Sequence, residues 1–208
     1  MDNHYFYEPS KGHGLAHDPL NAIIGPRPIG WISSRDKTGA RNLAPYSFFN
    51  CFNYSPPIIG FASVGYKDSL ANIIDTGEFV WNLTTRQLAE KMNLTSANLP
   101  PNADEFAFAG LTPATSTIVA AERVSESPVN FECKLSQCIQ LQAANGEEID
   151  TWLVLGEVVA VHIAKHLINN EGIYQTALAE PILRAGGPSA YYTISDTLRF
   201  DLARPKLP

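Results

Sequence analysis

The fold is decided by the stretch Val129-Asn130-Phe131-Glu132-Cys133-Lys134-Leu135-Ser136-Gln137-Cys138-Ile139-Gln140-Leu141-Gln142-Ala143. Apolar and polar side chains alternate along it, and only Gln137 interrupts the apolar series that runs through Cys133 and Ile139. Because successive side chains of an extended chain point to opposite faces, the alternation places the apolar series on one face. The stretch therefore predicts a long, half-buried antiparallel strand.

The residues that follow predict that this strand pairs with a second one. Asn145-Gly146 is the strongest short signal for a hairpin turn. The returning strand, residues 151–164, is apolar on both of its faces. A strand that is covered on both faces belongs in a barrel wall against another element, or in a subunit interface.

Further strands are predicted by short apolar runs between Gly and Pro residues. They are expected at residues 29–34, 42–49, 58–65 and 78–83. Pro45 lies inside the second of these, and proline cannot donate a ladder hydrogen bond, so that strand must sit at a sheet edge or a bulge.

A few helices interrupt the strands. Residues 67–76 predict a helix that ends at Gly77, and Thr84 with Gln87 has the pattern of a capping box that begins another. Residues 97–116 predict an irregular excursion with a short helical turn. The fold class expected from these patterns is mainly β with a few helices, as an antiparallel barrel.

Composition limits the kind of protein. The 208 residues are enough to bury a large core, and we expect a single domain over residues 1–208 with an N-terminal arm of about 1–19. Only 17% of the residues are charged, against about 25% in typical proteins, which favours a homo-oligomer with part of its surface covered. The net charge of −6, without a cluster of Lys or Arg, argues against a nucleic-acid partner.

The sequence also indicates where the protein is located and in which state its cysteines are. The apolar runs are far shorter than the ~20 residues that span a membrane, and the first residues lack the basic start and apolar stretch of a signal peptide. We therefore expect a cytoplasmic protein. Cys51, Cys133 and Cys138 match no metal or redox spacing, so we interpret them as reduced thiols, at least two of them in the core.

The common nucleotide-binding motifs are absent. Gly25 and Gly30 have the spacing of a phosphate-binding loop, but Trp31 and Ile32 stand where Lys and Ser or Thr belong. Gly12-His13-Gly14 lacks the third glycine of a dinucleotide fingerprint. A nucleotide, if one binds, must bind in another way.

Three polar and aromatic segments could hold a flavin: residues 25–34, 42–50 and 66–72. A flavin needs an apolar face for its ring, hydrogen-bond donors for its pyrimidine edge, and Arg, Lys, hydroxyls or a helix N-terminus for its phosphate. Lys67-Asp68-Ser69 lies at a predicted helix start, where backbone N–H groups are free. The alternative is structural: the aromatic residues after Pro45 form core, and Asp68 and Ser69 only cap the helix.

The same segments resemble a known family. The motifs are Arg27-Pro28-Ile29-Gly30-Trp31-Ile32-Ser33-Ser34, Gly39, Asn42-Leu43-Ala44-Pro45-Tyr46-Ser47-Phe48-Phe49, Pro56-Pro57, Lys67-Asp68-Ser69-x-x-Asn72, Thr76-Gly77-Glu78-Phe79-Val80-x-Asn82, Glu105-Phe106, Gly110-Leu111-Thr112, Gly156-Glu157-Val158-Val159, Arg184-x-Gly186-Gly187, Tyr191-Tyr192 and Arg204-Pro205. Together they resemble the flavin reductase-like proteins, the FMN-binding split-barrel group that includes flavoredoxin and the reductase components of two-component monooxygenases. The resemblance covers roughly residues 20–206.

This resemblance implies a six-stranded antiparallel split β-barrel and a homodimer with FMN near the subunit interface. It also implies site residues. The ring and ribityl chain would be held through backbone and hydroxyl contacts by Trp31, Ser33, Ser34, Asn42, Ala44, Pro45, Tyr46 and Ser47. The phosphate end would be held by Lys67, Asp68, Ser69 and Asn72, where Ser69 replaces the Thr that is common in the family. No catalytic residue and no metal ligand is assigned.

The activity implied is that of an oxidoreductase that moves hydride or electrons from NAD(P)H through FMN to flavin, oxygen or a partner monooxygenase. Hydride transfer needs orientation more than acid–base groups, so the lack of a nucleophile–base pair agrees with it. Two alternatives stay open: an FMN electron carrier of flavoredoxin type, and a non-catalytic flavin-binding barrel. NADH or NADPH, the acceptor, and FMN as prosthetic group or exchanging substrate stay open as well.

The histidines have competing interpretations. His162 and His166 have the spacing of a helical zinc pair, but they lie at a strand end without the accompanying Glu. His162 could instead approach flavin or nicotinamide from the barrel rim, or be an ordinary hydrogen-bonded histidine. His13 and His17 fit the N-terminal arm, which could cross to a partner subunit.

Overall fold

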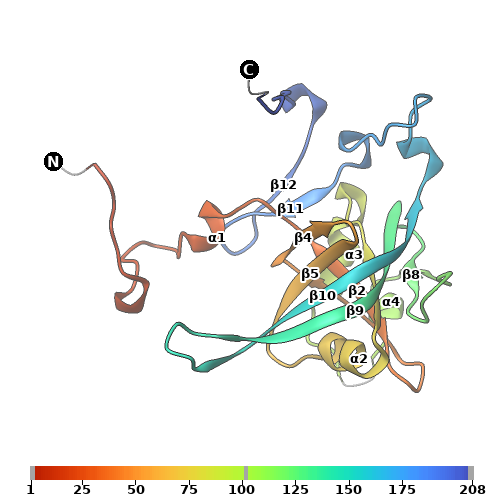
Figure 1. Cartoon of the computed structure of the whole chain (residues 1–208), viewed down its shortest axis with the longest axis horizontal. Coiled ribbons are helices and arrows are strands. Elements are labelled where there is room, and N and C mark those ends of the chain that lie inside the picture. The colour runs from red at the N-terminus through yellow and green to blue at the C-terminus, as the bar shows by residue number, and fades with distance from the viewer. Residues whose placement is uncertain (1–2, 101–102, 206–208) are drawn as a thin grey trace.

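The computed structural model describes residues 3–100 and 103–205, and its main body is one large antiparallel sheet that curls into a barrel (Figure 1). The strand order in this sheet is β3-β2-β6-β9-β10-β5-β4, and every neighbouring pair is antiparallel. The strands are β2 (Gly30–Arg35), β3 (Arg41–Tyr46), β4 (Phe49–Tyr54), β5 (Pro57–Val64), β6 (Glu78–Asn82), β9 (Val129–Gln142) and β10 (Glu148–Ile163). The mainly β, antiparallel prediction is confirmed.

Smaller elements surround this sheet. Two further sheets consist of β1 (Arg27–Pro28), β11 (Ile182–Arg184) and β12 (Tyr191–Thr193), and of β7 (Pro113–Ala114) and β8 (Arg123–Val124). The α-helices are α1 (Leu20–Ile23), α2 (Asp68–Thr76), α3 (Ala89–Leu94) and α4 (Glu105–Phe108). Short 3₁₀ helices are η1 (Pro9–Lys11), η2 (Arg86–Leu88), η3 (Lys165–Leu167), η4 (Ala177–Ala179) and η5 (Asp196–Leu198).

The long hairpin of β9 and β10 forms as the sequence predicts. Gly146 in its turn has a φ of 87°, a left-handed conformation that glycine adopts without a Cβ clash. β10 pairs with β9 on one side and β5 on the other. The hairpin thus joins the two halves of the main sheet.

The alternation along β9 changes face partway, which differs from the prediction. Gly156 pairs with Leu135 but Leu155 pairs with Gln137, so Ser136 is an extra residue in a β-bulge. A one-residue shift turns every later side chain to the other face. Accordingly Ile139 is 43% exposed, whereas Cys138 packs against the core.

One predicted strand is divided in the structure. The strand expected at 42–49 ends at Tyr46, and the chain starts a new strand, β4, at Phe49. The main sheet therefore has seven strands rather than six. Pro45 does lie in a strand at the sheet edge, as predicted, because β3 is the first strand of the order.

The predicted capping box at Thr84 is wrong. The residue that caps η2 is Thr85, without a side-chain hydrogen bond, and α3 follows from Ala89. The reason is tertiary: the Thr84 carbonyl accepts the N–H of Ile182, and the Arg86 N–H donates to the carbonyl of Glu180. Pairing with this later segment replaces the local cap.

The thiol prediction is half right. Cys133 is buried and Cys138 is partly buried, but Cys51 is exposed on the unpredicted strand β4. Only one cysteine is therefore fully in the core. Burial raises the pKa of the Cys133 thiol far above its ordinary value, which keeps it protonated.

The core consists of two main clusters on either side of the sheet. One contains Phe61, Phe79 and Trp81 and includes residues of α2. The other packs α3 and α4 onto β2 and β3 around Trp31 and Phe106. These clusters hold β3 and the start of α2 in fixed positions relative to each other.

The described N-terminal segment, from residue 3, and the described C-terminal segment, up to residue 205, extend away from the barrel (Figure 1). The predicted N-terminal arm is described from residue 3, and residues 1–2 of the arm, 101–102 of the excursion and 206–208 of the tail lie outside the described part of the chain. Among residues 3–100 and 103–205, no helix has both the length and the apolar composition needed to cross a bilayer.

Candidate flavin site

A cavity of about 360 Å³ lies between β3, the start of α2 and the segment that precedes α4. Its described walls are Asn42, Ala44, Pro45, Tyr46, Lys67, Asp68, Ser69, residues 95–100, Ala103 and Glu105. Pockets that hold small ligands typically measure about 300–1,000 Å³. Seven of the twelve residues predicted to bind the cofactor thus come together around one cavity.

The start of α2 faces this cavity. Lys67 is the N-cap residue in an extended conformation, and no side chain caps the helix. The first N–H groups of a helix lack intrahelical acceptors, and the helix dipole makes this end attractive to anions. Gly77 ends α2 in a left-handed conformation, as predicted.

Three side chains from three elements form a hydrogen-bonded chain in the cavity wall. The Ser69 hydroxyl of α2 donates to Asn42 Oδ1 of β3, and Asn42 Nδ2 donates to Glu105 Oε1 of α4 at 3.4 Å. Glu105 Oε2 accepts the backbone N–H of Leu43 at 3.1 Å. Leu43 lies on β3, the edge strand of the main sheet. The chain thereby ties α4 and α2 to the edge strand.

Tyr46 packs at this cavity with its hydroxyl fully buried. The residue is 6% exposed, and the hydroxyl approaches the side chains of Ser69 and Ser63 without a well-formed hydrogen bond in the described part of the chain. Burial raises the pKa of Tyr46, so it keeps its proton. A buried hydroxyl without a well-formed hydrogen bond is costly. Ser69 and Ser63 are the side chains that can relieve this cost.

The charges around the cavity are mixed. Lys67 is the only basic side chain among its described lining residues, and Asp68 and Glu105 are acidic. Burial is the largest cause that raises the pKa of Glu105, and the nearby charges of Asp104 and Asp68 add to it. The hydrogen bond from Leu43 opposes this rise.

The other five predicted residues stand behind the cavity rather than lining it. Trp31 is fully buried and donates from Nε1 to Thr95 Oγ1 at 3.0 Å, which supports the cavity wall. Asn72 Nδ2 donates to Ser34 Oγ at 3.2 Å and ties α2 to β2.

Ser33 and Ser47 also bond within the protein. The Ser33 hydroxyl donates to the carbonyl of Glu122 at 2.6 Å, and the Ser47 carbonyl accepts from Arg27 Nε at 2.9 Å. Neither residue lines the cavity. Both remain predictions as flavin contacts.

Residues 95–100 and 103–105 were not predicted as part of the site. Their anchor is Asp104, whose Oδ1 accepts the N–H groups of Phe106 and Ala107 as the cap of α4, while Oδ2 binds Arg41. An Asp followed by Glu before apolar residues is a helix-start signal. That signal could have located α4, but not its contact with β3.

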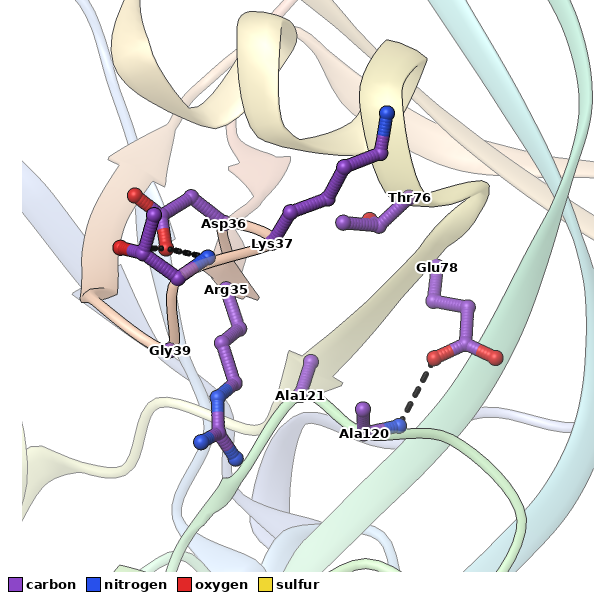
Figure 2. Close-up of a pocket in the computed structure, with 9 residues that line it drawn as sticks. Arg35, Asp36, Lys37, Gly39, Thr76, Glu78, Ala120 and Ala121 are labelled. Carbon is purple, nitrogen blue, oxygen red and sulfur yellow. Dashed lines mark hydrogen bonds between the residues drawn. The ribbon is translucent and has the colours of Figure 1, made fainter.

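A second cavity, shown in Figure 2, has a different character. It lies at the turn between β2 and β3, beside the end of α2, and Asp36 there binds the N–H groups of its own turn at Thr38 and Ala40. Lys37 pairs with Asp75, and Glu78 accepts the Ala120 N–H at 2.7 Å. These charged groups are therefore held by contacts within the protein.

The histidines lie away from the candidate site. His162 Nε2 bonds Glu132 Oε1 at 2.6 Å, which is the ordinary hydrogen-bonded alternative. His13 Nδ1 accepts the N–H of Leu15 within the N-terminal arm. Within the described ranges, no group of three or more His, Cys, Asp or Glu side chains is arranged to hold a metal ion.

Comparison with known proteins defines the class. Residues 25–181 match the family described as flavin reductase like domain. With its split-barrel architecture, this chain belongs to the flavin reductase-like family, and the resemblance seen in its motifs is confirmed.

Individual relatives agree with this assignment. An uncharacterized protein of Aquifex aeolicus is 36% identical over 170 residues, covering 79% of this chain and 83% of the relative. The structure of nitrilotriacetate monooxygenase component B from Bacillus cereus is similar, with 34% identity, a TM-score of 0.80, and coverage of 88% of this chain and 90% of that one. A protein assigned as a flavin reductase with a split barrel domain, from Shewanella frigidimarina, has 27% identity and a TM-score of 0.78, with coverage of 88% and 90%.

Proposed function

We propose that this protein is an FMN-binding oxidoreductase that moves hydride or electrons from NAD(P)H through FMN to a flavin, to oxygen or to a partner monooxygenase. The family assignment supports the reaction class. The observation that carries the proposal is the cavity at the start of α2, because it combines an uncapped helix N-terminus with the positive charge of Lys67. These groups attract a phosphate ester.

The residues present fit the phosphate end of FMN. Lys67 would contribute a positive charge, and the first N–H groups of α2 would donate to phosphate oxygens. Ala44 and Pro45 offer apolar surface beside these groups, while Asn42 can exchange hydrogen bonds with ribityl hydroxyls. Site residues therefore act by binding and orientation.

FMN supplies the redox chemistry when it is bound: its ring accepts a hydride and passes electrons on. The protein contributes geometry and exclusion of water, so a general base is unnecessary at the site. The similarity to a monooxygenase component supports an acceptor that is a partner enzyme.

We propose that the chain acts as a homodimer. Large apolar side chains of both terminal segments are exposed, including Phe6 at 79%, Ile23 at 70% and Phe200 at 82%. Exposed apolar groups in such numbers mark interaction surfaces. The low content of charged residues also favours a surface that is partly covered by a partner. A second copy of the chain is the partner that would cover these segments.

The test is the visible spectrum of the purified protein before and after anaerobic addition of NADH or NADPH. Bleaching of the bound flavin by one of the two supports the proposal. Flavin that is bound but bleached by neither would overturn the reductase activity and favour an electron carrier. A colourless protein that takes up no FMN would overturn flavin binding itself.

A further inference from the structure

Glu105 determines which way the amide of Asn42 faces. Both oxygens of its carboxylate accept hydrogen bonds, one from Leu43 N–H and one from Asn42 Nδ2. If the amide were turned over, Asn42 Oδ1 would face Glu105 Oε1 at the same 3.4 Å, and two acceptors would repel. An ionised Glu105 therefore holds Asn42 with its oxygen directed at Ser69.

This orientation fixes the proton of Ser69. Because Asn42 Oδ1 carries no proton, the Ser69 hydroxyl must be the donor in their short hydrogen bond. Ser69 then presents oxygen lone pairs, and not a proton, to the cavity. Lone pairs suit a hydroxyl group of a ligand and oppose a fully ionised phosphate.

A neutral Glu105 allows the opposite arrangement. A protonated carboxyl, or an amide in its place, can donate to Asn42 Oδ1 while its other oxygen still accepts from Leu43. Asn42 then turns over and donates from Nδ2 to Ser69. The hydroxyl proton of Ser69 becomes free to point at a phosphate oxygen.

We propose that Glu105 is a positioning residue that sets, through Asn42, whether Ser69 offers a proton or lone pairs to the phosphate end of a bound flavin. The site's preference for FMN over riboflavin thus depends on the charge of Glu105. This inference rests on the proposed function, because it places the flavin phosphate in the cavity at α2. The only covalent change in the coupling is that the Glu105 carboxylate takes up one proton from solvent; the rest is rearrangement of hydrogen bonds.

Other charged groups around Glu105 are accounted for. On its own helix, Asp104 is paired with Arg41 of β3 at 2.9 Å, and Arg41 also binds Glu122 at 3.2 Å. On α2, Asp68 is a second carboxylate whose charge acts on Glu105, and Lys67 lines the same cavity. Tyr46 of β3 stays protonated because burial raises its pKa more than hydrogen bonding to Ser69 and Ser63 lowers it. The raised pKa of Glu105 brings its protonation closer to neutral pH.

The test measures Kd for FMN and for riboflavin by flavin fluorescence in the wild type, Glu105→Gln, Ser69→Ala and the double variant. At about pH 8 the phosphate is a dianion, since its second pKa is about 6. We expect Glu105→Gln to bind FMN about tenfold more tightly, the effect of one charge-assisted hydrogen bond, and riboflavin within about twofold of the wild type. The difference between the two proteins should shrink as the pH falls.

The double-mutant comparison separates this coupling from simple removal of a negative charge. Glu105→Gln should change the affinity for FMN by less than about twofold when Ser69 is Ala, because no hydroxyl remains to turn. An equal gain in both backgrounds, or no gain in the wild-type background, would overturn the inference while FMN binding stands. Failure of every protein to bind either flavin would overturn the proposed function itself.

A second comparison does not require Glu105→Gln to fold. In the wild type, the ratio of FMN to riboflavin affinity should rise more steeply with falling pH than in Ser69→Ala. Both proteins bind the same phosphate, whose own titration cancels in the comparison. Identical pH profiles would overturn the role of Glu105.

Discussion

Glu132 shows how a single buried charge can be part of the structure rather than of the site. Its side chain is fully buried, and it accepts backbone N–H groups of Thr117 at 2.7 Å and Ile118 at 2.6 Å, together with His162 Nε2. Burial alone would raise the pKa of Glu132, but these hydrogen bonds outweigh it and lower the pKa from 4.5 to about 2. The carboxylate fastens the loop before β8 onto the sheet.

A pH-dependent stability follows from Glu132. Because its folded pKa is lowered, its contribution is complete above the unfolded value of 4.5 and disappears as the pH falls through about 2. At roughly 1.4 kcal/mol per pKa unit, the contribution is about 3 kcal/mol. Urea unfolding of the wild type at a series of pH values should show this loss, and Glu132→Gln should be less stable at neutral pH by about 2–4 kcal/mol.

The control is Glu148→Gln, which removes an exposed carboxylate at the start of β10. It should leave the stability within about 0.5 kcal/mol of the wild type. A Glu132→Gln protein with the same stability and the same acid dependence as the wild type would contradict the role of Glu132.

At the residue scale, the sequence predicts contacts that are local and misses those that are distant. Lys67 and Ser69 were predicted because a helix start is readable from neighbouring residues. Glu105 was not predicted as a site residue, because its hydrogen bond with Leu43 joins residues that are 62 positions apart in the chain. No spacing rule connects two such residues, and only the packing of α4 on β3 does.

At the element scale, the hairpin of β9 and β10 was predictable and its bulge was not. The interruption at Gln137 is visible in the sequence, but it does not show whether the apolar side chains after it stay on the same face of the sheet. The extra residue Ser136 is accommodated because Gly156 lies opposite Leu135. Whether a bulge forms at Ser136 therefore depends on residues of the partner strand β10.

Gly156 tests this packing. A Cβ at this position would lie 2.4 Å from the ring of Phe79, which is fully buried, and 3.2 Å from the Cβ of Cys133. We expect Gly156→Ala to lower the free energy of unfolding by about 1–3 kcal/mol, the usual cost of overpacking a core. Chemical denaturation measures this directly.

Gly146→Asn is the matched control in the same hairpin. A Cβ at Gly146 would meet nothing within 4 Å, and asparagine tolerates the left-handed conformation of this turn. Its effect should stay below about 1 kcal/mol. Equal losses for the two variants would show that the hairpin, and not the contact with Phe79, is the sensitive feature.

At the scale of the whole molecule, the terminal segments carry large apolar side chains that contacts within one chain leave exposed. The N-terminal segment extends from the barrel (Figure 1), and its exposed side chains include Tyr5 at 64% and Phe6 at 79%. An N-terminal arm is predicted from the sequence, and we propose that a second copy of the chain covers its exposed apolar side chains.

Light scattering coupled to size exclusion tests the dimer. The full chain should elute as a dimer, and deletion of residues 3–19 should shift the equilibrium toward monomer by at least about tenfold in dissociation constant, because apolar contact area is lost. The double variant Tyr5→Ser, Phe6→Ser should also raise the dissociation constant of the dimer, by a smaller factor. A full chain that is monomeric at all accessible concentrations would contradict the dimer.

The central claim is that the cavity between β3 and α2 holds the phosphate end of a flavin, and titration of FMN and riboflavin into Lys67→Gln tests it most directly. Lys134→Gln is the control, since it removes an exposed charge from β9 away from the cavity. We predict that Lys67→Gln weakens FMN binding by roughly tenfold, the loss of one charge-assisted contact, and leaves riboflavin and the control nearly unchanged. Equal affinity for FMN in Lys67→Gln and in the wild type would contradict the claim.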